Sequence, residues 1–341
     1  MATVPDGGGV APARLRPADA HLFDEALRRV AAVAAGVRLG LRTNSSTITV
    51  GFRPREFTSA DGPVRADLSI NGEIVDTAVV GADGIATLQT GITEVAELEV
   101  WLPHRGTVAV DHVTVDDRAQ VEASTREAPV WLAHGSSITQ SRFSTSPAMS
   151  WPSQVARTLG LDLFNLGFAG ECQLEPVIAR MMAAMPADII SVCAGINPYT
   201  SISMSERVYR ANLAGFITIL RDSHPTAPIL VSSPIASPKR ESTPNHPRVP
   251  PPFARRLLRS QRARLPVGSV GPTLIELRDA THDVAGELVN AGDANLHVVD
   301  GRTLLSASDA EHLVDGLHPD QLGEDVIAER YGPLLAPLAQ P

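Results

Sequence analysis

The hydrophobic pattern of this chain changes near residue 125, and that change limits the folds open to it. Between residues 37 and 122, short apolar segments alternate with polar residues at a period of two, which is typical of strands with one buried face. Asn71-Gly72 separates two such segments, and this dipeptide is a strong hairpin signal. Many short strands with frequent turns predict an all-β sandwich, jelly-roll-like, over residues 21–125.

After residue 125 the expected strands are continuous apolar runs separated by helices. The strands are expected at 130–133, 163–166, 188–193, 228–233 and 296–299, and the helices at 150–160, 174–185, 203–222, 273–290 and 320–335. Ser203 and Glu206 are expected to form a capping box at the start of the third of these helices. This alternation predicts a parallel sheet with helices on both faces. We therefore expect a three-layer α/β/α domain of flavodoxin-like type over residues 126–341. The Gly- and Pro-rich residues 1–20 are expected to be flexible.

Charge and composition argue against several classes of function. The net charge of −9 disfavours general affinity for nucleic acid or for an anionic membrane. No run approaches the ~18 apolar residues that span a bilayer, and the N-terminus lacks the pattern of a secretory signal. Two cysteines give no disulfide framework, and no clustered Cys/His pattern indicates a metal. We expect a cytoplasmic protein that acts on a small molecule without a cofactor.

Two strings supply the groups that nucleophilic acyl transfer needs. Gly135-Ser136-Ser137-Ile138-Thr139 places a serine hydroxyl directly after the first strand of the predicted sheet. Asp315-Gly316-Leu317-His318-Pro319 places a carboxylate three residues before an imidazole, after the last strand. A hydroxyl, a base and an anion that orients the base form a catalytic triad. The candidates are Ser137, His318 and Asp315.

Two further candidates follow neighbouring strands of the same predicted sheet. Gly170 comes after the second strand, where a glycine lets the backbone N–H approach a substrate oxygen closely. Asn197 comes after the third strand and offers a neutral amide donor. Because ligands bind beyond the carboxyl ends of parallel strands, we expect these residues to lie near the triad.

These four segments resemble the four signature blocks of the SGNH (GDSL-like) hydrolases, in the right order over residues 128–337. The blocks are Gly135 to Thr139, Gly167 to Glu171, Gly195 to Asn197, and Asp315 to Pro319. This chain departs from the pattern at Ser136, where the family usually has Asp, and at Pro198, where Asp often follows the block Asn. The β-sandwich ahead of the domain is similar to that of a subgroup of two-domain bacterial esterases and acyltransferases.

The resemblance implies a serine esterase that cleaves a small or carbohydrate-like ester through an acyl-enzyme on Ser137. The oxyanion would meet the N–H groups of Ser137 and Gly170 and the side-chain amide of Asn197. His134, Pro198 and His246 are weaker candidates for substrate binding, although the favoured interpretation of His134 is a structural histidine at the end of a strand. His246 lies in the Pro-rich segment 237–252, for which a lid over the site and a stiff solvated connection are alternatives. Two alternatives stay open, namely an acyltransferase that uses a small-molecule acyl donor and an inactive binding module. The oligomeric state is not predicted.

Overall fold

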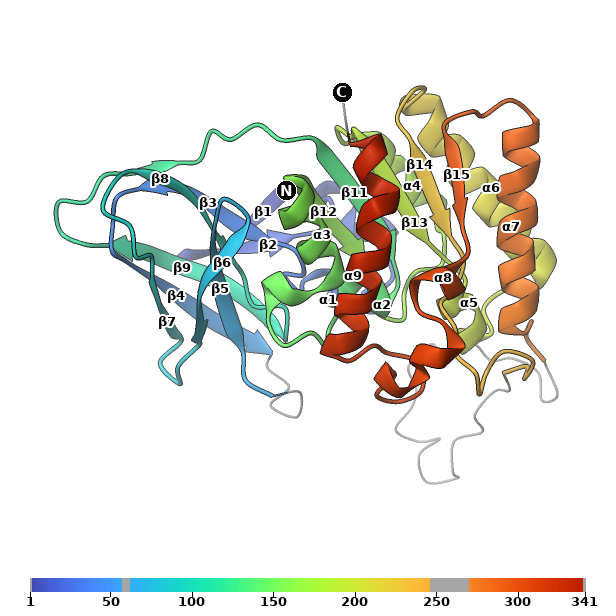
Figure 1. The fold of residues 1–341 in the computed structure, drawn as a ribbon, viewed down its shortest axis with the longest axis horizontal. Coiled ribbons are helices and arrows are strands. Elements are labelled where there is room, and N and C mark those ends of the chain that lie inside the picture. The colour runs from blue at the N-terminus through green and yellow to red at the C-terminus, as the bar shows by residue number, and fades with distance from the viewer. Residues whose placement is uncertain (1, 57–61, 246–269, 340–341) are drawn as a thin grey trace.

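The computed structural model describes residues 2–56, 62–245 and 270–339, and its two halves lie side by side in Figure 1. The half on the left holds two antiparallel five-stranded sheets. One sheet has the order β1 (Ala2–Asp6), β2 (Gly9–Ala13), β9 (Thr107–Val115), β4 (Thr47–Glu56) and β7 (Ile85–Gln89). The other has the order β10 (Val121–Ala123), β3 (Arg38–Thr43), β8 (Ala96–Trp101), β5 (Arg65–Ile70) and β6 (Glu73–Val79). The predicted β-sandwich is confirmed.

The core of the β-sandwich follows from the period-two pattern of its strands. Ile48, Leu68, Leu88 and Val100 are fully buried in one hydrophobic cluster between the sheets. The predicted hairpin at Asn71-Gly72 joins β5 to β6. Asn71 and Gly72 both have positive φ, at 53° and 84°, as a two-residue hairpin turn with the twist of its strands requires.

The N-terminal segment is ordered, which differs from the flexible segment expected over residues 1–20. Strands β1 and β2 form a hairpin, and a 3₁₀ turn (Pro17–Leu22) and helix α1 (Glu25–Ala31) follow it. Leu15, Phe23 and Leu27 are buried in the same cluster as Leu166 and Met181 of the other half. These apolar side chains bury enough surface to order the segment against the α/β half. Strand β2 also pairs with β9, so the segment is joined to both halves.

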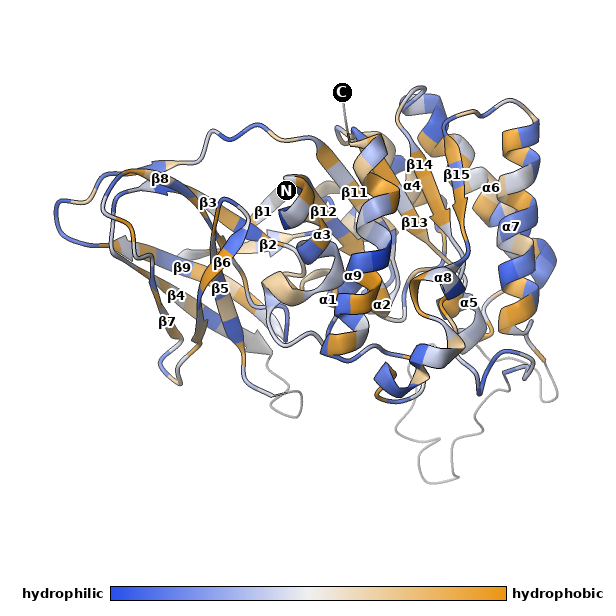
Figure 2. Ribbon diagram, viewed as in Figure 1, coloured by the Kyte–Doolittle hydropathy of each residue, from blue (hydrophilic) through white to orange (hydrophobic). Residues whose placement is uncertain are grey.

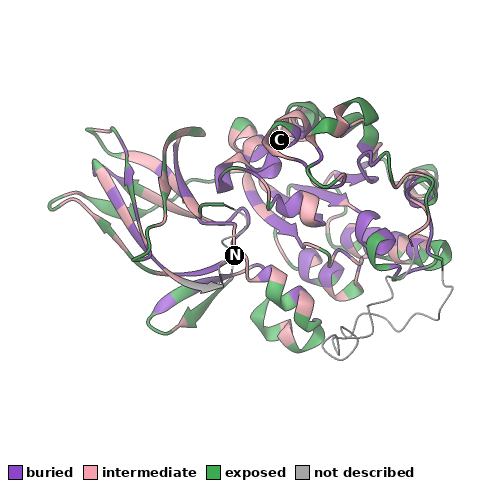
Figure 3. Cartoon of the chain, turned by 90° about the horizontal axis from the view of Figure 1, so that it is seen from below, coloured by how far each residue is buried: buried purple, intermediate pink, exposed green. Residues whose placement is uncertain are grey.

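The second half is a parallel sheet covered on both faces. Its strand order is β12 (Asp162–Gly167), β11 (Val130–Gly135), β13 (Ile189–Cys193), β14 (Ile229–Ser232) and β15 (Leu296–Val299). Figure 2 shows these strands largely in the colour of apolar residues, and Figure 3 shows the sheet buried between helices. This arrangement confirms the predicted three-layer α/β/α domain. Residues 124–129 form neither helix nor strand, and we propose that the domain boundary lies there.

The helices divide between the two faces of this sheet. Helices α4 (Pro176–Ala183), α6 (Glu206–Ser223) and α7 (Leu274–Asn290) share one hydrophobic cluster with the sheet, and α3 (Trp151–Leu159), α8 (Gly301–Leu304) and α9 (Gln321–Leu335) share the other. Two short helices, α2 (Ser137–Gln140) and α5 (Ile196–Ser201), and 3₁₀ turns at Pro147–Met149, Ala307–His312 and Ala336–Leu338 complete the described elements. No helix within the described ranges is long and apolar enough to cross a membrane.

Helix ends follow their capping residues, with one correction. Ser150 caps α3, which ends at Gly160, and Thr273 forms a capping box with Glu276 at the start of α7. The predicted capping box of Ser203 and Glu206 is wrong, because Ser205 is the N-cap of α6 and accepts from the Val208 N–H. The Ser203 hydroxyl donates instead to the side chain of Gln173.

Polar contacts join the β-sandwich to the segment that follows α2. The buried carboxylate of Asp67 accepts a hydrogen bond of 2.7 Å from the Ala148 N–H. His104, which is also buried, bonds through Nε2 to the Ser144 hydroxyl at 3.0 Å. Arg65 donates to the carbonyl of Thr145 at 3.0 Å. The β-sandwich therefore holds residues 144–148, which follow α2, through hydrogen bonds.

Candidate active site

Three strand ends bring the predicted site residues to one edge of the sheet. The parallel register pairs Gly135 of β11 with Gly167 of β12 on one side and with Cys193 of β13 on the other. Ser137, Gly170 and Asn197 follow these three strand ends within two to four residues. Since parallel strands end at the same edge, the three segments leave the sheet together, as the sequence predicted.

Ser137 is the first residue of α2, a single helical turn. Its neighbour Ser136 is the N-cap, and the Ser136 hydroxyl accepts from the Ile138 N–H. Helix α2 packs so closely on the end of β12 that a Cβ at Gly167 would lie 2.4 Å from the backbone nitrogen of Gln140. Only glycine fits there. The short turn is thus held against the sheet edge while the half-buried Ser137 faces the solvent-accessible side.

Ser137, His318 and Asp315 form a continuous chain of hydrogen bonds. The Oγ of Ser137 lies 2.8 Å from Nε2 of His318, and Nδ1 of the same ring lies 2.8 Å from Oδ2 of Asp315. With the Nδ1 proton held by the carboxylate, Nε2 is left as the acceptor for the hydroxyl proton. This arrangement can activate a serine for attack on a carbonyl carbon.

The loop before α9 holds the carboxylate of Asp315 in place. Its second oxygen, Oδ1, accepts from the backbone N–H groups of Leu317 and His318 at 3.0 and 2.9 Å. Partial burial raises the pKa of Asp315, but the hydrogen bonds and the charge of His318 outweigh that effect, so the pKa lies below its usual value. The carboxylate stays ionised at neutral pH and keeps the imidazole oriented.

Gly170 and Asn197, the two predicted donors, lie after β12 and β13 at this edge. Gly170 has a φ of +80°, and a Cβ built on it would meet nothing within 4 Å, so the space on that side of the residue is open. The side-chain oxygen of Asn197 accepts from the Cys172 N–H at 3.0 Å. Because a backbone N–H is always a donor, this bond fixes the amide orientation and leaves Nδ2 as the free donor edge.

Two of the weaker binding candidates, His134 and Pro198, are buried. His134 is fully buried, its Nδ1 bonds to the carbonyl of Leu166, and its ring stacks on Phe216. Burial lowers the pKa of His134 to about 4, so the ring is neutral and structural. Pro198 is also buried, within α5. The prediction for His246 lies outside the described residues, as do residues 247–252 of the proposed lid.

Two residues outside the predicted site contact the triad directly. The centre of the Phe143 ring lies 5.3 Å from the centre of the His318 ring, and the two rings are tilted by 43°. Arg240 donates to the carbonyls of Asp315 and Gly316, so it stabilises the loop that carries Asp315. Phe143 has no sequence signal, and Arg240 was indicated only as part of the Pro-rich segment 237–252, because these contacts form only in the folded chain.

Neither thiol near the site is activated. Burial raises the pKa of Cys193 to about 11 and raises that of Cys172 well above its usual value. Both cysteines are free. In the described ranges no three His, Cys, Asp or Glu side chains are grouped so that they could hold a metal ion.

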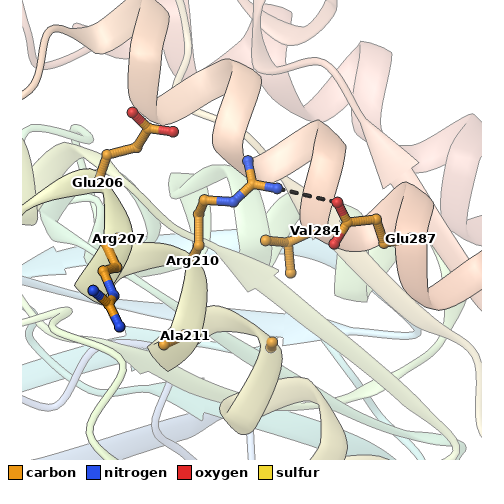
Figure 4. Close-up of a pocket in the computed structure, with 7 residues that line it drawn as sticks. Glu206, Arg207, Arg210, Ala211, Val284 and Glu287 are labelled. Atoms are coloured by element: carbon orange, nitrogen blue, oxygen red, sulfur yellow. Dashed lines mark hydrogen bonds and ion pairs between the residues drawn. The ribbon is translucent and has the colours of Figure 1, made fainter.

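A separate surface groove lies between α6 and α7 (Figure 4). It is lined by Glu206, Arg207, Arg210, Ala211, Ala214, Val284 and Glu287. Arg210 forms ion pairs with Asp283 at 2.9 Å and Glu287 at 3.2 Å across the groove. None of these residues belongs to the site at the sheet edge, and the charges largely satisfy one another.

Part of the chain matches a known family, and the whole chain shares its fold with solved structures. Residues 129–247 match the sequence model of the GDSL-like lipase/acylhydrolase family. A salicylyl-acyltransferase from a tetracycline biosynthetic pathway, SsfX3, is 27% identical with a TM-score of 0.83, over 100% of this chain and 94% of that one. No curated protein matched the sequence.

Two other solved structures share the fold at lower identity. A GDSL-like lipase from Bacteroides ovatus, described as putative, is 20% identical with a TM-score of 0.73, over 98% of this chain and 93% of that one. A family two carbohydrate esterase from Clostridium thermocellum is 14% identical with a TM-score of 0.61, over 97% of this chain and 94% of that one.

The fold and these similarities define an enzyme of the serine hydrolase and acyltransferase class. Within that class, residues 129–247 match the GDSL-like lipase/acylhydrolase family, and the whole chain shares the two-domain fold of the salicylyl-acyltransferase, with an N-terminal β-sandwich. The resemblance found in the four sequence blocks is confirmed at this level.

Proposed function

We propose that the protein moves an acyl group from an ester through a covalent acyl-enzyme on Ser137. His318 takes the proton of the Ser137 hydroxyl through Nε2 as Oγ attacks the carbonyl carbon. Asp315 holds the imidazole and stabilises its positive charge. The observation that carries the proposal is the unbroken chain from Oγ to the carboxylate, with both links at 2.8 Å.

The tetrahedral intermediate needs donors for its negative oxygen. We assign them to the backbone N–H groups of Ser137 and Gly170 and to Nδ2 of Asn197. One donor of this kind is typically worth about 3 kcal/mol in the transition state. Support comes from the open space beside Gly170 and from the Cys172 N–H that fixes the amide of Asn197.

The first candidate for the second step is hydrolysis. The alcohol would first leave with the proton that His318 took from Ser137. His318 would then take a proton from the attacking water and return it to Oγ of Ser137 as the bond from Oγ to the acyl carbon breaks and the carboxylic acid is released. The substrate class proposed is a small or carbohydrate-like carboxylic ester. Its support is the match to the GDSL-like lipase/acylhydrolase family and the shared fold with carbohydrate esterases.

The second candidate is transfer of the acyl group to an alcohol of a natural product. It is favoured by the similarity to the salicylyl-acyltransferase, which extends over the whole chain, β-sandwich included. The two candidates use the same acyl-enzyme and differ in whether an acceptor alcohol outcompetes water at the site.

Labelling with a fluorophosphonate tests the acyl-enzyme step common to both candidates. Wild-type protein is expected to gain one adduct on the peptide that contains Ser137, as measured by mass spectrometry. Ser137→Ala should lose the adduct and all cleavage of an aryl acetate while keeping the wild-type circular dichroism. Ser203→Ala, which removes an exposed hydroxyl outside the site, should label like wild type.

An unlabelled, inactive wild-type protein would favour the binding-module alternative instead. For the two enzymatic candidates, products are measured from one acyl donor with and without added alcohols. Release of free acid at an unchanged rate indicates a hydrolase. An acylated alcohol that forms at the expense of the acid indicates a transferase.

A further inference from the structure

Arg14, in the segment after β2, is a buried arginine whose partners are all uncharged. Its side chain makes five hydrogen bonds, which equals the number of N–H groups that a guanidinium carries. The acceptors are the backbone carbonyls of Val30, Val33, Asn165 and Gly167 and the side-chain oxygen of Gln140. The guanidinium also lies 5.1 Å from the centre of the Phe168 ring.

Burial among uncharged partners costs free energy for the positive charge of Arg14. Arg14 is 3% exposed, and burial lowers its pKa to about 9, which still leaves the group protonated at neutral pH. Val30 and Val33 lie at the C-terminal end of α1, where helix carbonyls carry partial negative charge and offset part of the cost. An apolar side chain would fill the same space without that cost, so stability alone does not explain an arginine here.

Three of the five acceptors belong to the active-site edge. Asn165 and Gly167 are at the carboxyl end of β12, directly before the loop that carries Gly170. Gln140 is the last residue of α2, the turn that begins with Ser137. The side-chain oxygen of Gln140 also accepts from the Ala169 N–H at 2.9 Å. Arg14 thus joins the nucleophile turn and the Gly170 loop through one planar group.

We infer that Arg14 is a positioning residue, which the N-terminal segment supplies to fix the Gly170 loop relative to Ser137. It acts through the carbonyls of Asn165 and Gly167 and through Gln140, and it does not touch the substrate. The inference rests on the proposed role of Gly170 as an oxyanion donor. It also gives the ordered N-terminal segment a function in catalysis, separate from any role of the β-sandwich in binding.

The test compares Arg14→Met with Arg38→Met. Arg38 is a second arginine that reaches β12 from the N-terminal part of the chain, but it bonds Asp162 and the Leu163 carbonyl, at the end of β12 away from the site. Arg14→Met is expected to lower kcat on an aryl ester about tenfold, with KM changed less than twofold, because small misplacements of a catalytic donor are expensive. The rate of fluorophosphonate labelling should fall by a similar factor. Arg38→Met is expected to lower the melting temperature and keep the wild-type kcat.

Gln140→Met provides a second route if Arg14→Met does not fold. It leaves the guanidinium in place and removes the acceptor that links Arg14 to the Ala169 N–H, so it should also lower kcat without raising KM. Where both single variants fold, the double variant should lose less kcat than the two single losses combined would predict, since both residues act on the same loop.

Three outcomes would overturn the inference. A wild-type kcat in a folded Arg14→Met or Gln140→Met protein, while Asn197→Ala is impaired, rejects the positioning role and leaves the proposed function intact. Equal losses of kcat in Arg14→Met and Arg38→Met would indicate a general effect of stability. If wild-type protein neither labels nor cleaves esters, the proposed function fails and this inference fails with it.

Discussion

Oγ of Ser137 lies 2.8 Å from Nε2 of His318, although 181 residues separate the two in the chain. The contact depends on two loops at the same sheet edge, one after β11 and one before α9. His318 is also held by Asp315 at 2.8 Å and touched by the ring of Phe143. The predictions below concern the groups that keep this contact in place.

Asp315→Asn should reduce kcat by about a thousandfold or more while the protein stays folded. The asparagine oxygen can keep accepting the backbone N–H groups of Leu317 and His318, so its NH₂ group faces Nδ1 of the imidazole. That favours the tautomer with the proton on Nε2, which cannot accept from the serine. Steady-state kinetics on an aryl acetate measure the loss. Activity within tenfold of wild type would contradict the assigned role of Asp315.

Asn197→Ala should lower kcat about a hundredfold and change KM little, because the amide acts on the oxyanion and not on the bound ester. Asn197→Asp serves as the companion variant. It can keep the bond from the Cys172 N–H, yet it places a negative oxygen where the donor stood, so its kcat should be no higher than that of the alanine variant. An effect confined to KM would count against the oxyanion role.

Glu324→Gln should change the pH dependence of stability. Glu324 on α9 is 1% exposed and accepts from the Trp151 N–H, and burial raises its pKa to about 8, with further repulsion from Asp325 and Asp320. In the unfolded chain the Glu324 carboxyl has its ordinary pKa of 4.5. Between that pH and about 8, the folded state therefore keeps a proton on Glu324 that the unfolded state has lost. Stability is therefore greatest at low pH and is lost as pH rises through this range.

The glutamine variant removes that loss, because it stays neutral and keeps an acceptor for the Trp151 N–H. At pH 9 it should melt on the order of 5 °C above wild type, and near pH 4 the two should differ little. Glu329→Gln, an exposed change on the same helix, is the control and should follow wild type at both pH values. Parallel melting curves of wild type and Glu324→Gln across pH would reject the prediction.

Asp67→Ala should destabilise the protein by about 3 kcal/mol, since it leaves the buried Ala148 N–H and the Thr77 hydroxyl without their acceptor. Urea unfolding measures the change. Asp83→Ala, at an exposed turn of the same β-sandwich, should cost much less. Equal costs for the two variants would show that the contact between the halves contributes little.

Thiol reagents should leave the native enzyme active. Both cysteines have raised pKa values, so the reactive thiolate is scarce at neutral pH. After iodoacetamide treatment at pH 7.5, the intact mass and the esterase rate are expected to be unchanged, while denatured protein should gain two adducts. Rapid inactivation that substrate prevents would point to a thiol in the site.

The elements of the fold could be predicted from local pattern because each depends on neighbouring residues. Apolar runs gave the strands of the parallel sheet, Asn71-Gly72 gave a hairpin of the β-sandwich, and Ser150 and Thr273 marked helix starts. The capping residue of α6 was misplaced by two positions, because Ser203 and Ser205 both have the right chemistry and only backbone geometry selects between them.

For His134 the sequence left two alternatives, a pocket residue and the favoured structural histidine, and contacts between distant segments could not be predicted at all. His134 adjoins the serine block in sequence, yet the alternation of the strand turns it into the core against Phe216. Arg14 lies in a segment expected to be flexible, and its acceptors at Asn165 and Gly167 are 151 and 153 residues away. No local pattern reports a contact over that distance.

The sequence by itself determined the α/β class, the order of the four blocks and the candidate triad, because residue types and spacing are sufficient for those. Only the tertiary structure decided that the space beside Gly170 is open, which histidine is neutral and buried, and that the N-terminal segment braces the site. Those properties depend on burial and on distances between residues far apart in the chain, and both exist only once the sheets have packed.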